Sequence, residues 1–221
     1  LDAALRANDS FLISSHVNPD GDCIGSQLAV MWYLQTLGKR VCVYNTDPVP
    51  TKFAWLHGAD RIGTRRPEGP FDVVMLLDSS NPDRLGWSGS TAMGRTVINI
   101  DHHRDNTRFG DINIVEPTAA TAEILYGLFG EGGVTYPAHV AEALYAAIMT
   151  DTGGFRFSNT TSAVLRICAD LVDRGADCAA IYEKVYASSS EGGMQLHARV
   201  WPTLKFHLDG RVCTLELPLD L

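Results

Sequence analysis

The chain has 221 residues, of which 45% are hydrophobic and 20% are charged, so it can bury a full core and form one domain plus part of another. Its formal net charge of -8 argues against a protein that grips long nucleic acid through a broad basic face. No apolar run approaches the ~18 residues needed to cross a membrane, and no signal-peptide pattern opens the chain, so we expect a cytoplasmic protein. The five cysteines include no Cys-x-x-Cys pair, which argues against a disulfide framework and a thiolate zinc site. We expect most of them to be ordinary core residues.

Predicted strands and helices alternate in the first half of the chain, and helices dominate afterwards. In chain order, the predicted elements are strand 11–15, helix 25–37, strand 41–45, helix 51–57, strands 71–77, 97–100 and 112–115, and helices 119–129, 137–150, 161–174 and 177–187. Residues 71–77 are the strongest strand candidate, because their nearly unbroken apolar character suits a parallel sheet covered on both faces. The pattern predicts an α/β fold, with a doubly wound, mainly parallel sheet, helices on both faces and a helical segment behind it.

The composition changes at residues 187–193, Ala-Ser-Ser-Ser-Glu-Gly-Gly, which indicates a linker or a loop before a short helix. Beyond it, residues 203–208 and 211–217 alternate around Asp209-Gly210, a two-residue hairpin signal. A lone hairpin is only marginally stable, so we interpret it as the opening of a second domain. The predicted organisation is a first domain over residues 1–187, a linker and connecting helix over 188–200, and a hairpin of a truncated C-terminal domain over 201–221.

Polar side chains follow three of the predicted strands at the points where the strands end. His16 follows the first strand, Asp78 follows residues 71–77, and Asp101 follows residues 97–100. Ligands of doubly wound sheets bind beyond the carboxyl ends of the strands, so these distant segments deliver polar groups to one edge.

The stretch from His16 to Asp22 carries one imidazole and two carboxylates. Taken alone, it can be a strand-to-helix turn in which Asp20 and Asp22 cap the next helix. If Asp78 and Asp151 converge with it, four carboxylates would crowd together, and their repulsion would raise several pKa values unless cations are present. Two divalent ions would resolve this conflict.

The ligand types also predict the metal and the chemistry. Imidazole and carboxylate without thiolate suit Mn²⁺ better than metals that prefer soft ligands, with Mg²⁺, Fe²⁺ and Co²⁺ as rivals. Two such ions about 3.5 to 4 Å apart would share a bridging carboxylate and a bridging water, which would become a hydroxide nucleophile near neutral pH. Because the ions would also neutralise charge on a phosphoryl group, the residues predict in-line phosphoester hydrolysis.

The tripeptide Asp101-His102-His103 stands directly behind the apolar residues 97–100. It could merely cap the next segment, but the other ligand candidates argue against that interpretation. Adjacent histidines after a strand point in different directions, so one can bind a metal while the other faces substrate. Asp101 would then orient or buffer one of these imidazoles without binding the metal itself.

Together these motifs resemble the DHH phosphoesterases, the group that includes the RecJ exonucleases and the small nanoRNase and pAp-phosphatase enzymes. The motifs are His16-x-Asn18-Pro19-Asp20-Gly21-Asp22, Asp78 after a strand, Asp101-His102-His103, and Asp151-Thr152-Gly153. The resemblance implies a manganese-dependent enzyme with a doubly wound N-terminal domain. The first motif and the compact spacing resemble the nanoRNase type, whereas manganese pyrophosphatases usually carry threonine where Gly21 stands.

The resemblance also implies roles for individual residues. By position, His16, Asp20 and Asp78 would hold one metal ion, and Asp22, Asp78, His102 and Asp151 the other. His103 corresponds to the family's substrate-side histidine, a catalytic and substrate-binding candidate, with Asp101 behind it. Arg156 resembles a phosphate contact, with a plain surface arginine as the alternative.

The leading expectation is a hydrolase of short oligonucleotides that also removes the 3′-phosphate of a nucleoside bisphosphate such as pAp. The alternatives are a cyclic or linear dinucleotide phosphodiesterase, a manganese pyrophosphatase-like hydrolase and a non-catalytic nucleotide-binding domain. The acidic balance fits short substrates rather than long duplexes, and we expect no membrane partner. The sequence leaves the oligomeric state open, with a homodimer among the options.

One departure from the family concerns the C-terminal part. Family members of this type continue into a smaller substrate-binding domain with a Gly-Gly-Gly-His signature, and this sequence contains none. Either a truncated sequence or a core-only protein would explain that. In both cases we expect metal binding to survive, because all proposed ligands precede the linker, whereas substrate selectivity and turnover would depend on whether such a domain is present.

Overall fold

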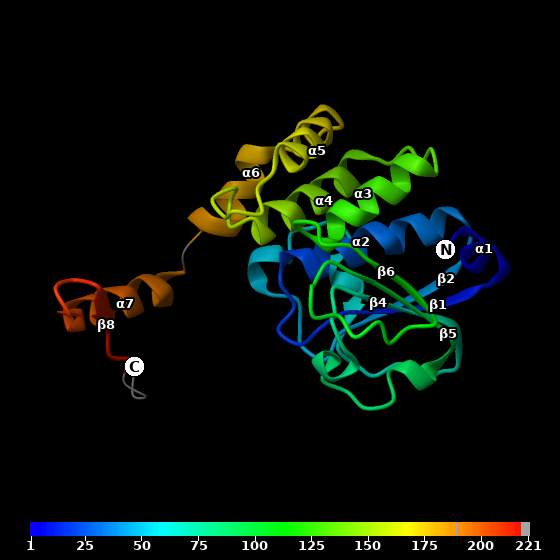
Figure 1. Cartoon of the computed structure of the whole chain (residues 1–221), viewed down its shortest axis with the longest axis horizontal. Helices are drawn as coiled ribbons and strands as arrows, with labels where there is room; N and C mark the ends of the chain where they lie inside the picture. The colour runs from blue at the N-terminus through cyan, green and yellow to red at the C-terminus, as the bar shows by residue number, and fades with distance from the viewer. Residues whose placement is uncertain (189, 218–221) are drawn as a thin grey trace. The chain divides into compact units, whose positions relative to one another are not determined.

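The computed structural model describes residues 1–188 and 190–217, and its contacts divide the chain into two units, Leu1–Tyr182 and Glu183–Leu221. The larger unit is built on a six-stranded sheet in the order β3-β2-β1-β4-β5-β6, in which all neighbouring strands are parallel (Figure 1). The strands are β1 Ser10–Ser14, β2 Arg40–Tyr44, β3 Ile62–Gly63, β4 Phe71–Leu77, β5 Gly94–Asp101 and β6 Ile112–Val115. The prediction of a doubly wound α/β fold is confirmed.

The order of the strands reverses at β1. Leu12 pairs with Cys42 of β2 on one side and with Val74 of β4 on the other, so β1 and β4 are neighbours although they are far apart in sequence. Ligands of open α/β sheets bind outside the carboxyl ends of the strands at such a switch point. The loops that follow β1 and β4 therefore occupy the position where this fold builds sites.

Helices cover one face of the sheet (Figure 1). They are α1 Asp2–Ala7, α2 Gly21–Thr36, α3 Thr121–Glu131, α4 Ala138–Asp151, α5 Ser162–Asp173 and α6 Cys178–Tyr182. α2, α3 and α4 lie over the sheet, and α5 and α6 pack beyond them. Because α2 lies between the sheet and α4, most of its residues are buried and it lacks the polar stripe of a surface helix.

The opposite face of the sheet packs against short 3₁₀ segments and loops. Leu12, Val74 and Val97 are cross-strand neighbours, and they form a core cluster with Leu85 of η3 (Pro82–Leu85). Met93 of η4 (Thr91–Met93) packs against the same cluster. Helical cover thus exists on both faces, but on this side it consists of 3₁₀ turns rather than long helices.

Several element bounds differ from those expected. α2 begins at Gly21 rather than at residue 25, because the Asp20 side chain caps it. The segment 51–57 contains only the 3₁₀ turn η1, Thr51–Phe53, and the two-residue edge strand β3 was not predicted, because so short a strand has no periodicity. The segment 177–187 divides into α6 and the π-helical turn η5, Glu183–Ala187.

The smaller unit contains a helix and a hairpin, α7 Glu191–Val200, η6 Trp201–Thr203, β7 Lys205–His207 and β8 Val212–Thr214. The two-residue turn prediction is wrong, because His207 pairs with Val212 and leaves a four-residue loop. Leu208 has a positive φ of 48° and so cannot continue the strand.

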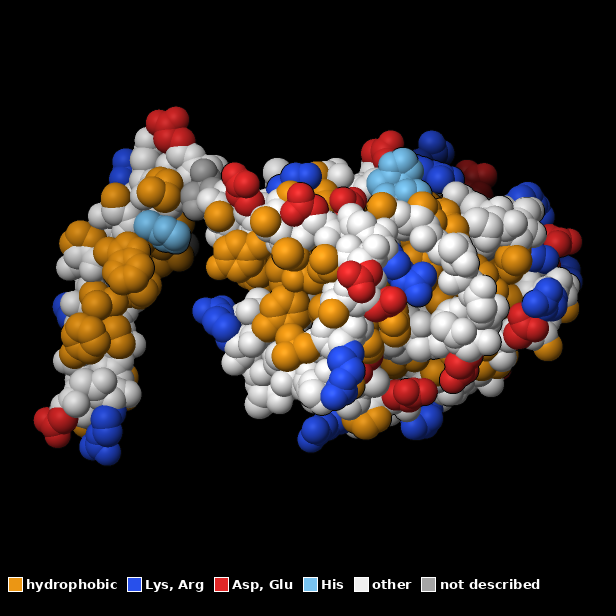
Figure 2. Space-filling view, turned by 90° about the horizontal axis from the view of Figure 1, so that it is seen from above, with side chains coloured by type: hydrophobic (Ala, Val, Ile, Leu, Met, Phe, Trp, Pro, Cys, Tyr) orange, Lys and Arg blue, Asp and Glu red, His pale blue; other side chains and the backbone are white. Residues whose placement is uncertain are grey.

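Hydrophobic side chains of this smaller unit are exposed, and they cover much of its visible face in Figure 2. They include Trp201, Phe206, Leu208, Leu215 and Leu217. The predicted domain bounds, 1–187, 188–200 and 201–221, stay predictions. Among the described residues, no helix is long and apolar enough to cross a membrane.

Candidate metal centre

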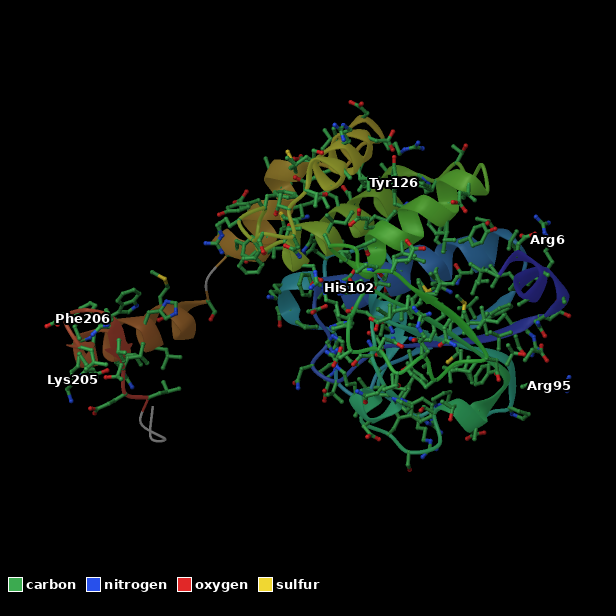
Figure 3. The ribbon with its side chains drawn as sticks, viewed as in Figure 1. Arg6, Arg95, His102, Tyr126, Lys205 and Phe206 are labelled. Carbon is green, nitrogen blue, oxygen red and sulfur yellow. The ribbon has the colours of Figure 1, made fainter. Side chains whose placement is uncertain are left out.

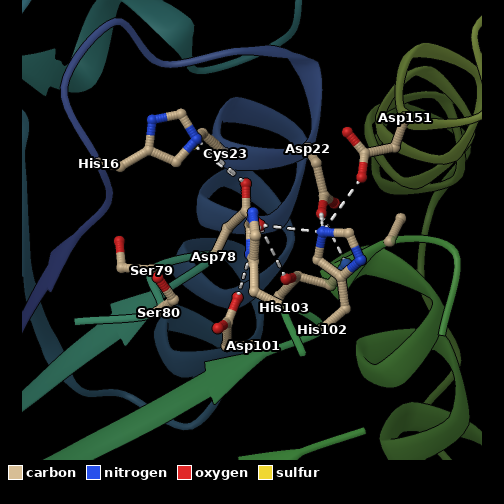
Figure 4. Close-up of polar contacts among 12 residues, drawn as sticks. His16, Asp22, Cys23, Asp78, Ser79, Ser80, Asp101, His102, His103 and Asp151 are labelled. Atoms are coloured by element: carbon tan, nitrogen blue, oxygen red, sulfur yellow. Dashed lines mark hydrogen bonds and ion pairs between the residues drawn. The ribbon is translucent and has the colours of Figure 1, made fainter. Parts of the chain in front are cut away.

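Six side chains predicted as metal ligands converge at the carboxyl edge of the sheet, and all of them except Asp20 are labelled in Figure 4. They are His16 after β1, Asp20 and Asp22 at the start of α2, Asp78 after β4, His102 after β5, and Asp151 at the end of α4. His102 lies where the helices meet the carboxyl ends of the strands (Figure 3).

Asp78 stands between two groups of donor atoms. Its Oδ2 is 3.6 Å from His16 Nε2, and its Oδ1 is 3.4 Å from His102 Nε2. Asp78 is 1% exposed and has a left-handed φ of 54°, a strained conformation for a non-glycine residue that is concentrated at functional sites. The two oxygens of one buried carboxylate therefore face two separate clusters, which is the geometry that a bridging ligand requires.

The first cluster contains His16, Asp20 and Asp78. The Nδ1 atom of His16 lies 2.6 Å from the carbonyl oxygen of Val17 and donates to it, so Nε2 is the nitrogen that can bind a metal. Nε2 faces Asp78 and, at 3.8 Å, the Oδ2 atom of Asp20.

Asp20 serves two purposes with its two oxygens. Oδ1 accepts hydrogen bonds from the amides of Asp22 and Cys23 at 3.0 and 3.1 Å, and it thereby caps α2. Oδ2 takes no part in the cap and faces His16. Capping and ligation are thus compatible for this residue.

The second cluster contains Asp22, His102 and Asp151. The Nδ1 atom of His102 donates to the carbonyl oxygen of Thr118 at 3.2 Å, so Nε2 is again the nitrogen that can bind a metal once it has lost its proton. Nε2 lies 3.1 Å from Asp151 Oδ2 and 3.8 Å from Asp22 Oδ2. Both imidazoles therefore direct Nε2, the nitrogen that a metal ion would bind, at carboxylate oxygens.

Asp22 is oriented by the N-terminus of a second helix. Its carboxylate accepts hydrogen bonds from the amides of Thr121 and Ala122 of α3 at 2.6 and 3.0 Å, and from Ser26 Oγ at 3.2 Å. Ala120, the N-cap residue of α3, has no capping side chain of its own. Asp22 therefore caps α3 from another helix, and that contact holds its carboxylate in place.

The glycine of the Asp-Gly-Asp motif allows α2 and α4 to approach closely. A Cβ atom on Gly21 would lie 2.8 Å from Thr150 Cγ2 and 2.9 Å from Thr150 Cβ. One turn later, a Cβ atom on Gly25 would lie 2.9 Å from Ala147 Cβ. These two glycines bring the start of α2 against the end of α4, and hence Asp22 near Asp151.

The carboxylates of the two clusters are crowded and buried, so added positive charge would stabilise their ionised forms. Burial and the charge of Asp78 raise the pKa of Asp22 well above its usual range, and the same two causes raise the pKa of Asp151 to about 7. Burial lowers the pKa of His102, but its contact with Asp78 and the charge of Asp22 outweigh this and raise it to about 10. Although burial raises the pKa of Asp78, hydrogen bonds from His102 and His16 hold it below its ordinary value. Metal cations would supply this positive charge, and the histidine and carboxylate donors present fit them.

His103 has a different environment from His102. Its Nδ1 atom lies 2.7 Å from Asp101 Oδ1, and its Nε2 atom lies 3.0 Å from Arg84 Nη1. A guanidinium only donates, so Nε2 must accept from Arg84 and the proton must be on Nδ1, which donates to Asp101. His103 Nδ1 also lies 3.5 Å from Asp78 Oδ1, but in this tautomer it carries a proton that it donates to Asp101 and offers no lone pair to a metal.

Asp101 is fully buried next to His103, and its role as an orienting carboxylate stays a prediction. Its Oδ2 accepts a hydrogen bond from Asn106 Nδ2 at 2.6 Å, and Asn106 also donates to Asn99 Oδ1 at 2.8 Å. Asn99 in turn donates to the carbonyl oxygen of Ser79, next to Asp78, at 3.1 Å. A buried polar network thus joins the loop after β5 to the loop after β4.

Cys23 and Cys168 are buried in the core and Cys42 packs against it, as expected for most of the cysteines. Cys178 and Cys213 are exposed, and Cys23 lies in the first metal cluster. The Cys23 thiol donates to Asp78 Oδ2 at 3.2 Å, and burial together with the charge of Asp78 raises its pKa well above its usual range. Cys23 is therefore a hydrogen-bond donor to the bridging carboxylate. Its adjacency to the Asp-Gly-Asp motif was the signal that could have revealed it.

Arg156 stays apart from these contacts. It is exposed, and its Nε donates to the carbonyl oxygen of Gly153 at 2.8 Å. A pocket of about 510 Å³ does open beside His102 and His103, and its lining includes Arg104 and Asn159. The role of Arg156 in binding phosphate stays a prediction.

Comparison with known proteins gives concordant results. The DHH family, N-terminal domain, matches residues 10–148. The bifunctional oligoribonuclease and PAP phosphatase NrnA of Thermus thermophilus is 37% identical over 212 residues, which cover 94% of this chain and 63% of that protein. A more distant relative, a probable manganese-dependent inorganic pyrophosphatase of Enterococcus faecalis, is 30% identical over 158 residues, which cover 68% of this chain and 50% of that protein.

A solved structure shows the same likeness in three dimensions. It is an exopolyphosphatase-related protein from Bacteroides fragilis, with a TM-score of 0.93 and 30% identity. The match covers 99% of this chain and 68% of that one. The chain thus spans about two thirds or less of each of these relatives.

Proposed function

This chain belongs to the DHH family, and from that premise we propose that it is a divalent-metal-dependent phosphoesterase. Its proposed substrates are short oligonucleotides and the 3′-phosphate of nucleoside bisphosphates such as pAp. The name of the Thermus relative, which states both activities, supports this choice.

The single observation that carries the proposal is the position of Asp78. Its two oxygens lie 3.6 and 3.4 Å from the Nε2 atoms of His16 and His102, and a backbone carbonyl holds each imidazole with Nε2 directed inward. A carboxylate placed between two imidazole–carboxylate clusters supports a pair of metal ions with a shared ligand. We assign His16, Asp20 and Asp78 to one ion and Asp22, Asp78, His102 and Asp151 to the other.

Manganese is the proposed metal. The donors are imidazole nitrogen and carboxylate oxygen, and Cys23 remains a thiol, so the set favours Mn²⁺ over metals that prefer sulfur. The name of the Enterococcus relative supports the same metal. Bound divalent ions would neutralise charge on a phosphoryl group and make a water molecule nucleophilic near neutral pH.

The roles of Asp22, His103 and Asp101 follow from the hydrogen bonds that hold their side chains. In the complex, a metal ion and the hydrogen bonds from the α3 amides would together hold Asp22 as a carboxylate. His103 lies beside the cluster, with Nδ1 tied to Asp101 and Nε2 directed away from Asp78 toward Arg84. We assign it to the substrate side, where it contacts the phosphoryl group or assists departure of the leaving oxygen, with Asp101 as its orienting partner.

A substrate panel tests the proposal. The manganese-loaded chain is assayed with pAp, a linear dinucleotide, a cyclic dinucleotide and pyrophosphate, with the Asp78→Ala variant as the blank. We expect turnover of pAp and the dinucleotide. Hydrolysis of pyrophosphate alone, or of the cyclic dinucleotide alone, would replace this function with one of the other two hydrolases.

Anomalous scattering at the manganese edge tests the metal assignment separately. We expect two peaks, one on each side of Asp78. One peak, or peaks away from these side chains, would refute the dinuclear site. Two peaks together with nucleotide binding but no hydrolysis of any substrate in the panel would favour a non-catalytic nucleotide-binding protein.

A further inference from the structure

Arg84 is a cation at the edge of the proposed catalytic site to which the sequence motifs assign no role. It lies in η3, directly after the β4 loop that carries Asp78. Its Nη1 atom lies 3.0 Å from His103 Nε2, and no ion pair links its side chain to a carboxylate of residues 1–188 or 190–217. A guanidinium whose nearest partner is a neutral imidazole keeps most of its hydrogen-bonding capacity for another group.

The backbone around Arg84 holds the residue firmly. Asn81 Oδ1 accepts hydrogen bonds from the amides of Asp83 and Arg84 at 3.1 and 3.3 Å, which caps η3. The carbonyl oxygen of Arg84 accepts a hydrogen bond from the amide of Val17 at 2.8 Å. Since Val17 follows His16, the same residue connects the β4 loop to the first metal cluster. The backbone that carries the Arg84 guanidinium is therefore held in place beside the first metal cluster.

The charge and the planar shape of the Arg84 guanidinium indicate a phosphoryl oxygen as its partner. The cluster holds four carboxylates, so the ions bound there would attract an anionic substrate to the side on which His103 lies. Arginine presents a planar fork of donors that matches two oxygens of a phosphate, and a charge-assisted bond of this kind is stronger than one to neutral imidazole. An arriving phosphoryl group would compete successfully with His103 for the guanidinium.

We propose that Arg84 binds a non-bridging oxygen of the substrate's phosphoryl group and releases His103 Nε2 to face the substrate when it does so. This inference rests on the proposed phosphoesterase function. The opposing explanation is structural, in which Arg84 only holds the His103 ring and never contacts phosphate.

A double-mutant cycle separates these explanations, because a residue that acts only through His103 has no effect once His103 is gone. The proteins are the manganese-loaded chain and its Arg84→Met, Arg84→Lys, His103→Ala and Arg84→Met/His103→Ala variants. Arg95→Met is the matched control, since Arg95 is 81% exposed and lies at the opposite end of β5 from His102 (Figure 3). The probe is inorganic phosphate, titrated by calorimetry, with manganese content and Tm measured for every variant.

We expect Arg84→Met to weaken phosphate binding about 10- to 100-fold in both the wild-type and the His103→Ala backgrounds. Arg84→Lys should recover part of this loss, because it keeps the charge without the fork. Arg95→Met should bind phosphate as wild type does, and manganese content should stay normal throughout. In turnover of pAp, Arg84→Met should lower kcat/KM about 100-fold.

Two results would overturn the inference. One is unchanged phosphate affinity when Arg84→Met is added to His103→Ala, and the other is a wild-type protein that binds manganese but no phosphate. Failure of the proposed function has a different signature. In that case the wild-type protein hydrolyses no member of the substrate panel, while the phosphate titrations still decide whether Arg84 is an anion-binding residue.

Discussion

Replacing Gly21 with alanine tests whether close packing of α2 and α4 builds the metal centre. The added methyl group would lie 2.8 Å from Thr150 Cγ2 and 2.9 Å from Thr150 Cβ, and its contact with Thr150 Oγ1 would be closer still. Rotation of the threonine cannot relieve the overlap, because Cβ itself is too close and Oγ1 donates to the carbonyl oxygens of Ala146 and Ala147. The helices must therefore separate.

The expected cost follows from these contacts. Overpacking of a tight core site costs about 1–3 kcal/mol, and replacing glycine by alanine in a helix returns about 0.5–1 kcal/mol. We expect a net loss of about 1–2 kcal/mol in the free energy of unfolding. In a domain of this size each kcal/mol lowers Tm by about 2–4 °C, which gives a fall of about 2–8 °C. Since Asp22 follows Gly21 directly, separation of the helices also moves its carboxylate away from Asp151, and we expect manganese to bind about 10-fold more weakly.

The assay is thermal and urea unfolding of the metal-free protein together with a manganese titration. Gly127→Ala in α3 is the matched control, because a Cβ atom there would meet nothing within 4 Å. It should stabilise the protein by up to about 1 kcal/mol and leave manganese affinity unchanged. If Gly21→Ala behaves like Gly127→Ala in both measurements, close approach of the helices does not build the site.

Three further predictions concern the metal and the substrate. Asp78→Ala should lose both metal ions and all activity. His103→Ala should keep its manganese but hydrolyse the substrate about 10²- to 10⁴-fold more slowly. Equal metal loss in the two variants would contradict the role given to His103. Steady-state kinetics with pAp should show that Arg156→Ala raises KM about 10-fold at similar kcat. A large fall in kcat at unchanged KM would instead show that Arg156 acts in the transition state. Manganese affinity should rise with pH, because the metal-free protein has a pKa of about 10 at His102 and about 7 at Asp151, and both protons must leave before the metal binds. Calorimetry in buffers of different ionisation enthalpy should show release of about one proton or more per chain at pH 7, and proton-independent binding would rule out this linkage.

The fold was predictable wherever the sequence pattern was long and local. The range of β4, Phe71–Leu77, agrees with the expected strand, because a continuous run of apolar and β-branched residues needs no tertiary information to be recognised. The start of α2 was missed by four residues, since Gly21 and Asp22 look like a turn until the packing against α4 is known. The Asp-Gly turn of the hairpin was placed correctly in sequence but given the wrong length, because its register depends on which residues pair.

The roles of the ligand candidates were less predictable than their positions. The sequence left open whether Asp20 is a helix cap or a metal ligand. The structure shows one carboxylate oxygen of Asp20 in the cap and the other beside His16. Cys23 was treated as core, although its thiol donates to Asp78. In both cases the missing information was the direction of a side chain, which residue type and spacing do not contain.

The sequence by itself determined which chemical groups end each strand and helix, because strand ends and helix starts are set by residues a few positions away. On that basis it indicated the fold, the family resemblance and the set of residues that meet at one edge. Only the tertiary structure decided how those groups are oriented. The amide that fixes Asp22 belongs to Thr121, 99 residues later, and the donor that fixes the tautomer of His103 belongs to Arg84. Hydrogen bonds between such distant residues form only when the sheet brings their loops together, so no local pattern could reveal them.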